Sequence, residues 1–143
     1  MKSAFLSDMF HALRAGEGFV VPVSSAATCW LTSVDCAADN FVHALVTCLD
    51  STPENRAIIL RALQVRSSDL AAAIVDGADG HSAAVSYESD AQLEAAFGSY
   101  PPLLTPIADT LGFVNDGDVQ LLVDKALART ADSRLQRTVM EAN

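Results

Sequence analysis

The chain has 143 residues, half of them apolar, which is enough for a single domain with its own core and too hydrophobic for intrinsic disorder. Its 9 basic and 18 acidic residues give a formal net charge of −9. This balance disfavours binding to nucleic-acid phosphates and to anionic membranes. No stretch approaches the roughly 18 apolar residues that a membrane span needs, and the N-terminal pattern predicts no signal peptide.

The three cysteines predict neither a disulfide framework nor a zinc site. They are Cys29, Cys36 and Cys48, an odd number in which no two form a C-x-x-C pair. This usage is typical of a reducing compartment, so we expect a cytoplasmic protein.

Apolar spacing in the first third of the chain predicts a helix followed by two strands. The helix is expected over 3–15 and ends at Gly16 in a left-handed conformation. The first strand is expected over 19–23, where Pro22 restricts it to a sheet edge or a strand end. A second strand is expected over 30–34.

A second helix is predicted over 36–49, with Ser33 or Asp35 as its N-cap. Its apolar residues share one face, and its polar residues lie mostly opposite. The apolar face comprises Ala38, Phe41, Val42, Leu45, Val46 and Leu49. The apolar run at 57–60 is consistent with a buried strand.

The next part of the chain predicts a helix over 69–75 and a short strand around 85–87. Ser89 and Gln92 have the spacing of a capping box, which would open a helix that ends at Gly98.

Two helices are predicted toward the C-terminus. Thr105 and Pro106 have the types preferred at N-cap and N1 of a short helix that ends at Gly112. The final helix is expected to begin near Asp118, with Leu121 off the centre of its apolar stripe. That stripe comprises Val119, Leu122, Val123, Ala126 and Leu127.

These elements predict a mixed fold, α/β or α+β, in which helices separate a few short strands. We expect one structured region over 1–131 and a polar tail over 132–143.

The familiar catalytic and nucleotide-binding motifs are missing from this sequence. A G-x-G-x-x-G fingerprint between strand and helix is absent, and so is a G-x-x-x-x-G-K loop. The segment Gly16-Glu17-Gly18 precedes a predicted strand rather than a helix. There is also no G-x-S-x-G and no H-E-x-x-H.

Three side-chain arrangements have a functional and a structural interpretation, and the structural one is favoured in each case. Asp35, Asp39 and His43 fall at i, i+4 and i+8, which covers two helical turns, so a solvated face is favoured over a metal site. Cys36 is favoured as an inert thiol, because neighbouring carboxylates disfavour a thiolate. Trp30 is favoured as a core residue over a ligand wall.

Several segments, in their order and spacing, resemble the extended short-chain dehydrogenases of the NAD-dependent epimerase/dehydratase family. The D-erythronate dehydrogenase type is the most similar within that family. The resemblance covers about residues 3–128. It is carried by Ser3-Ala4-Phe5-Leu6-Ser7-Asp8, Arg14-Ala15-Gly16-Glu17, Pro22-Val23, Trp30-Leu31-Thr32-Ser33-Val34-Asp35, Asn40-Phe41-Val42-His43-Ala44-Leu45 and Leu111-Gly112-Phe113 with Asp116, Asp118 and Val119.

The resemblance is to the C-terminal, substrate-binding part of these proteins, and no complete Rossmann sheet is implied. In the family the N-terminal half binds NAD(P) and carries a tyrosine with a lysine four residues later. Here the residues four positions after Tyr87 and Tyr100 are Ala91 and Leu104. The resemblance therefore implies that this chain alone neither binds NAD(P) nor turns over substrate.

The resemblance also implies candidate substrate-binding residues for a small polyol acid or a sugar derivative: Ser3, Phe5, Ser7, His11 and Trp30. His11 replaces an expected arginine, and histidine lacks the guanidinium fork that binds a carboxylate bidentately. The expected partners are a Rossmann-half chain or further copies of this chain in a homo-oligomer. The alternative is a non-catalytic interaction module, or an inactive fragment that exposes a former domain interface.

Overall fold

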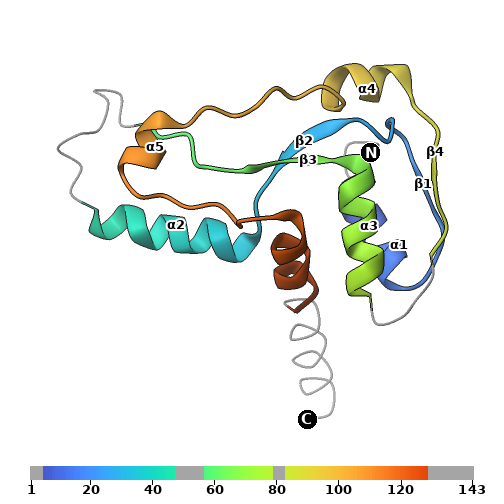
Figure 1. Ribbon diagram of the computed structural model, residues 1–143, viewed down its shortest axis with the longest axis horizontal. Coiled ribbons are helices and arrows are strands. Elements are labelled where there is room, and N and C mark those ends of the chain that lie inside the picture. The colour runs from blue at the N-terminus through green and yellow to red at the C-terminus, as the bar shows by residue number, and fades with distance from the viewer. Residues whose placement is uncertain (1–4, 48–56, 79–82, 129–143) are drawn as a thin grey trace, which may run out of the picture.

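The computed structural model describes residues 5–47, 57–78 and 83–128. These residues form the mixed α/β arrangement that the sequence predicts (Figure 1). The described elements are α1 (Phe5–Arg14), β1 (Phe19–Val21), β2 (Thr28–Leu31), α2 (Val34–Val46), β3 (Leu63–Arg66), α3 (Ser67–Gly77), β4 (Val85–Tyr87), α4 (Ala91–Phe97) and α5 (Pro106–Thr110). A last helix covers residues 119–128.

The strands of the described residues form two small sheets and no complete Rossmann sheet. β1 pairs in parallel with β4, and β2 pairs antiparallel with β3. An isolated bridge joins Thr28 to Ser99 beside β2. Pro22 follows the last residue of β1, as expected for a residue that cannot donate to a ladder.

The hydrophobic core lies where α1 and α3 pack against each other and against the strands (Figure 1). Its fully covered members include Met9, Leu13, Val21, Ile74 and Val123. The apolar stripe predicted on the first helix is therefore confirmed. No helix among the described residues is long and apolar enough to cross a membrane.

The C-terminus of α1 ends in the left-handed turn that the sequence predicts. Gly16 has a φ of +76°, a conformation in which glycine avoids the steric cost of a Cβ. Its N–H donates to Leu13 O and the N–H of Glu17 donates to Ala12 O, both at 3.0 Å. These two bonds form a Schellman motif, which satisfies carbonyls at the end of the helix.

Local polar chemistry sets the beginnings of α2 and α4. Of the two candidate caps for α2, Ser33 is the cap, because its Oγ accepts from the Cys36 N–H at 3.0 Å. The capping box predicted for α4 is wrong. Asp90 is the N-cap there and accepts from the N–H groups of Gln92 and Leu93. A carboxylate at this position complements the positive end of the helix as well.

The predicted buried strand at 57–60 is also wrong. These residues have no regular structure, and Ile59 is exposed. The strand instead occupies β3, where Leu63 and Val65 are covered and Gln64 and Arg66 are exposed. Alternation of apolar and polar residues is the signature of a half-buried strand, and it outweighs the nearby apolar run.

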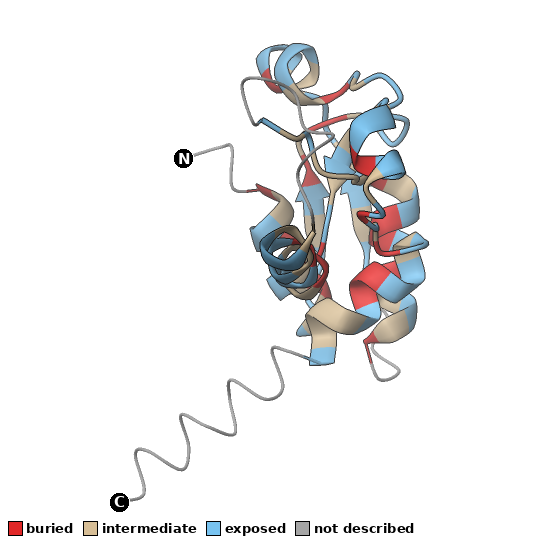
Figure 2. Cartoon of the chain, turned by 90° about the vertical axis from the view of Figure 1, so that its left-hand side faces the viewer, coloured by how far each residue is buried: buried red, intermediate tan, exposed pale blue. Residues whose placement is uncertain are grey.

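The apolar face of α2 points to solvent rather than into the core. Among the described residues of α2 the buried ones are Cys36 and Asn40, whereas Phe41 and Leu45 are exposed. Figure 2 shows buried and exposed residues along the longer helices. The two buried residues of α2 are one turn apart, on the side of the helix away from Phe41 and Leu45. An amphipathic surface helix normally turns its apolar face inward, so α2 departs from that expectation.

The last helix has the predicted register. Leu122 is 6% exposed and Val123 is fully buried, whereas Leu121 is 49% exposed. Asp118 opens this helix by accepting from the Leu121 N–H at 2.9 Å. The predicted tail over 132–143 lies outside the described residues.

Candidate functional site

A cavity of about 90 Å³ opens between the first turn of α1, β2, the start of α3 and the end of α4. Apolar groups supply most of its wall, as in most small-molecule sites. Its lining residues are Phe5, Leu6, Val23, Ala27, Thr28, Cys29, Ser67 and Phe97.

The Ser67 hydroxyl is the polar feature of this cavity that calls for a partner. Ser67 is 5% exposed, and its Oγ is the buried side-chain oxygen among the described residues that has no hydrogen-bond partner. Its backbone N–H is occupied by Ala27 O at 2.8 Å. Buried polar groups in native proteins are nearly always paired, so an unpaired hydroxyl on a residue that lines a cavity is a candidate partner for a ligand atom.

Cys29 lines the cavity, but its thiol is protonated and is not a nucleophile. Burial raises the pKa of this thiol above its ordinary value, so the neutral form dominates near pH 7. Sγ lies 3.9 Å from Val65 O, to which it donates weakly. None of the described residues that line the cavity is a carboxylate, lysine or histidine. These lining residues can therefore bind and orient a molecule, but they supply no acid or base for proton transfer.

A carboxylate on α4 holds one wall of the cavity in place. The Glu94 carboxylate accepts from the Ser24 N–H at 2.6 Å and from the Ser24 hydroxyl at 2.7 Å. Ser89 Oγ adds a third bond at 3.0 Å. These bonds lower the pKa of Glu94, those from Ser24 most, so the carboxylate stays ionised. Ser24 adjoins Val23, and the bonds thus join that wall to the helix that carries Phe97.

The structure does not gather the five predicted substrate-binding residues at one place. Phe5 lines the cavity and is also part of the core. Ser7 and His11 are exposed on α1 and do not line it. Ser3 lies outside the described residues.

Trp30 occupies a different surface. Its Nε1–H donates to Pro101 O at 2.7 Å, and its ring lies 4.9 Å from the Tyr100 ring, centroid to centroid. The side chain is 37% exposed, so the favoured interpretation as a core residue is wrong. It does not line the cavity either, and a substrate contact by Trp30 stays a prediction.

The row of Asp35, Asp39 and His43 does not converge on a metal site. His43 Nε2 lies 2.7 Å from Leu111 O, and its ring packs edge-on against Phe113 at 5.0 Å. No cluster of metal-ligating side chains occurs within residues 5–47, 57–78 and 83–128.

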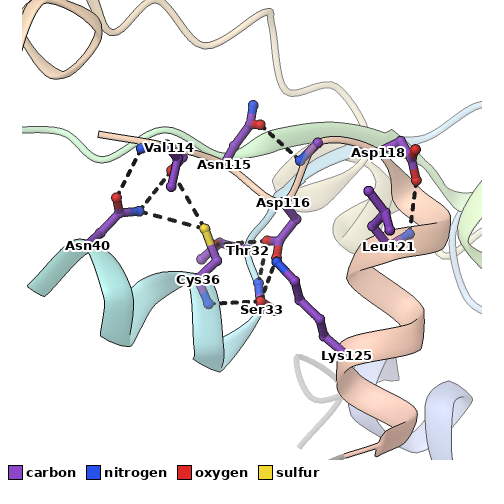
Figure 3. Close-up of polar contacts among 11 residues, drawn as sticks. Thr32, Ser33, Cys36, Asn40, Val114, Asn115, Asp116, Asp118, Leu121 and Lys125 are labelled. Carbon is purple, nitrogen blue, oxygen red and sulfur yellow. Dashed lines mark hydrogen bonds and ion pairs between the residues drawn. The ribbon is translucent and has the colours of Figure 1, made fainter. Parts of the chain in front are cut away.

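The buried carboxylate of Asp116 gathers several polar contacts (Figure 3). It accepts from the Ser33 hydroxyl at 2.5 Å and from the Ser33 N–H at 2.8 Å. Lys125 Nζ lies 2.8 Å from the same carboxylate, and Thr32 Oγ1 lies 3.3 Å from it. All of its acceptor positions are used, which makes it a structural link and not a base.

The ionisation state of Asp116 follows from opposing causes. Burial raises its pKa, but the hydrogen bonds from Lys125 and Ser33 together outweigh burial and leave the pKa below the ordinary value. The same contact raises the pKa of Lys125. Both groups are therefore charged at neutral pH. In the sequence Asp116 stands out only as part of a family likeness, because nothing local indicates a partner 83 residues away.

Two solved structures have a similar fold. One is a nucleoside-diphosphate-sugar epimerase from Agrobacterium tumefaciens, with a TM-score of 0.69 and 16% identity over 85% of this chain and 36% of that chain. The other is a partial consensus L-threonine 3-dehydrogenase, with a TM-score of 0.73 and 18% identity over 90% of this chain and 42% of that chain. No protein-family model matches the sequence, and no curated protein matches it.

The expected likeness to epimerases and dehydrogenases is thus confirmed at the level of fold. This chain spans less than half the length of either neighbour. The D-erythronate dehydrogenase type stays a prediction.

Proposed function

We propose that this chain is the substrate-binding portion of an NAD(P)-dependent oxidoreductase related to the epimerase/dehydratase family. The observation that carries the proposal is the fold match, which covers most of this chain but less than half of an epimerase and of a dehydrogenase. In this proposal the chain positions a substrate, and a dinucleotide-binding portion supplies the remaining chemistry.

The described residues do not fit a dinucleotide. Such a site needs a glycine-rich turn that leads from a strand into a helix N-terminus. Gly16 instead ends α1, in a turn that precedes β1. At the turn from β2 into α2 the Asp116 carboxylate already accepts from the Ser33 N–H, and the Ser33 hydroxyl already accepts from the Cys36 N–H, so these donors are not free for a pyrophosphate.

The cavity supports a ligand class for the proposed site. Its apolar wall and the single unpaired Ser67 hydroxyl suit a short carbon chain with one hydrogen-bonding group. L-threonine, whose side chain has one methyl and one hydroxyl, would place that side chain in the cavity and keep its carboxylate at the mouth, whereas D-erythronate would bring a hydroxyl on each of three carbons to the same wall. A nucleoside-diphosphate sugar is larger than about 90 Å³, so only a part of such a ligand would enter the cavity. Ser3, Ser7, His11 and Trp30 remain proposed contacts outside it.

Calorimetric titration with NAD⁺ and NADP⁺ tests whether cofactor binding belongs to a portion of the protein other than this chain. The isolated chain should show no stoichiometric site for either cofactor, whereas a site of micromolar affinity would contradict the proposal. The DNA that flanks the region coding for this chain gives a second test. A G-x-G-x-x-G fingerprint and a Tyr-x-x-x-Lys, in frame or in a neighbouring gene, are the expected result.

A non-catalytic interaction module is the second candidate, and the exposed apolar face of α2 favours it. The two proposals differ at the cavity, because an interaction module needs no small ligand there. Binding of a hydroxy acid at Ser67 would support the substrate-binding proposal.

A further inference from the structure

α2 presents a continuous apolar surface to solvent. Its members fall at i, i+7, i+8, i+11 and i+12, which places them along one side of the helix. We call this surface the α2 stripe, and it comprises Val34, Phe41, Val42, Leu45 and Val46, each between 60% and 85% exposed. Contiguous exposed patches of this kind on a monomer mark interaction sites.

Polar bonds on the opposite side of α2 fix the direction in which the stripe points. The Asn40 side chain donates to Val114 O at 2.8 Å and accepts from Val114 N–H at 3.0 Å. His43 Nε2 contacts Leu111 O. Figure 3 shows Ser33, which caps the helix and is also bonded to Asp116. Rotating the helix to bury its apolar side would break all of these bonds.

α2 also lies away from the core. It contributes no residue to the core formed around α1 and α3, and Figure 1 shows it on the opposite side of the molecule from those two helices. The stripe is therefore not the outer edge of the existing core. It is a second apolar surface that nothing within the described residues covers.

From this arrangement we infer that the α2 stripe is the surface on which the dinucleotide-binding portion of the fold docks. The inference rests on the proposed function. More than half of each structural neighbour has no counterpart in this chain, so a large part of the fold has to pack somewhere. Interfaces between domains bury about 600–1,500 Å². Among the described helices, the α2 stripe is the large exposed apolar face on which such an interface can form.

Charge argues against a second copy of this chain as the occupant. A two-fold interface brings the same patch of both copies together. The charged residues of α2 are Asp35 and Asp39, with no lysine or arginine on the helix, and each chain carries a net charge of −9. Self-association would therefore bring like charges together, whereas a neutral or basic partner face would not.

Site-specific photocrosslinking in the cells that produce the protein tests the docking surface. A benzophenone side chain replaces Leu45, which is 85% exposed in the α2 stripe, or Leu104, which is 82% exposed elsewhere. Mass spectrometry then identifies the crosslinked peptides, on the same polypeptide or on a separate one. We expect position 45 to crosslink to a sequence that carries the dinucleotide fingerprint, and position 104 not to. With the benzophenone kept at position 45, Phe41→Glu in the same stripe should reduce the yield of that crosslink by at least tenfold while leaving the unfolding temperature unchanged.

Every other outcome overturns the inference. The outcomes also show whether the docking surface alone is wrong or the proposed function fails with it. Crosslinks from position 45 to a second copy of the chain would make the stripe a dimer interface. Crosslinks to a protein without the fingerprint, or none, would show that the stripe serves another purpose. If only position 104 reaches a fingerprint-bearing sequence, the proposed function survives and the docking surface is wrong. If neither position reaches one, the proposed function fails as well.

Discussion

The Asp116 carboxylate accepts hydrogen bonds from both the backbone N–H and the hydroxyl of Ser33, at 2.8 and 2.5 Å, although the two residues are 83 positions apart. Ser33 is at the same time the N-cap of α2. One carboxylate therefore fixes the start of α2 to the segment that precedes the last helix. The direction of the α2 stripe depends on this contact.

Replacing this carboxylate should destabilise the chain. Asp116→Asn keeps the shape but loses the charge that Lys125 and Ser33 contact. We expect a loss of about 1.5–3 kcal/mol in the free energy of unfolding, the usual worth of hydrogen bonds to a charged group. Urea unfolding at pH 7 measures it. Asp124→Asn, on an exposed residue, should change the value by less than about 0.5 kcal/mol.

The same carboxylate should make the stability of the chain depend on acid pH. The pKa of Asp116 is lower in the folded chain than in the unfolded chain, so its contribution is present above the unfolded pKa of about 3.9. It is lost as the pH falls from there through the folded pKa. Glu94 contributes in the same direction. The slope of unfolding free energy against pH should be shallower in Asp116→Asn, and an unchanged slope would show that Asp116 is not ionised.

Truncation of two buried serines should have different effects on stability. Ser33→Ala removes bonds to Asp116 and Cys36 and should cost about 1–2 kcal/mol. Ser67→Ala removes a hydroxyl that has no partner and should leave stability unchanged or raise it. Thermal unfolding of both variants without added ligand makes the comparison. A larger loss for Ser67→Ala would show that its hydroxyl is paired within the protein.

Two neighbouring leucines test the register of the last helix. Leu122→Ala should cost about 2–5 kcal/mol because the side chain is buried. Leu121→Ala should cost less, because its side chain is half exposed. A denaturant series in which Leu121→Ala is the more damaging change would refute the register.

On α2 the polar residue should matter more to folding than its apolar neighbour. Asn40→Ala removes both bonds to Val114 from a buried position and should cost about 1–3 kcal/mol. Phe41→Ala, on an exposed side chain, should change stability by less than about 0.5 kcal/mol. The opposite ranking in chemical unfolding would mean that α2 packs with its apolar side inward.

Local signals in the sequence predict most of the elements, because their causes are local. Gly16 needs a left-handed turn, Pro106 suits the first helical turn, and the 3.6-residue spacing of the last helix buries Leu122 rather than Leu121. Prediction from the sequence fails where contacts between distant residues determine which face of an element is buried. Periodicity identifies the two faces of α2, but only the bonds to Asp116 and Val114 show which face is covered.

The candidate site is less predictable for the same reason. A family likeness points to Phe5, which lines the cavity. Nothing in the sequence points to Ser67, because a serine near the start of a helix is ordinary. Its significance comes from burial and a missing partner, both of which are properties of the folded chain. The Glu94 contacts with Ser24 likewise join residues 70 positions apart.

The most direct test of the account is a heteronuclear NMR titration of the isolated chain with D-erythronate and with L-threonine. If the chain positions a small hydroxy acid, at least one of them should shift the amide resonances of Ser67, Cys29 and Phe97 in a saturable way. Ser67→Ala should weaken that binding by roughly tenfold, the loss of one hydrogen bond of about 1.4 kcal/mol. Leu104→Ala should bind as the parent chain does. A titration in which neither acid moves the cavity resonances, or in which Ser67→Ala binds equally well, would contradict the account.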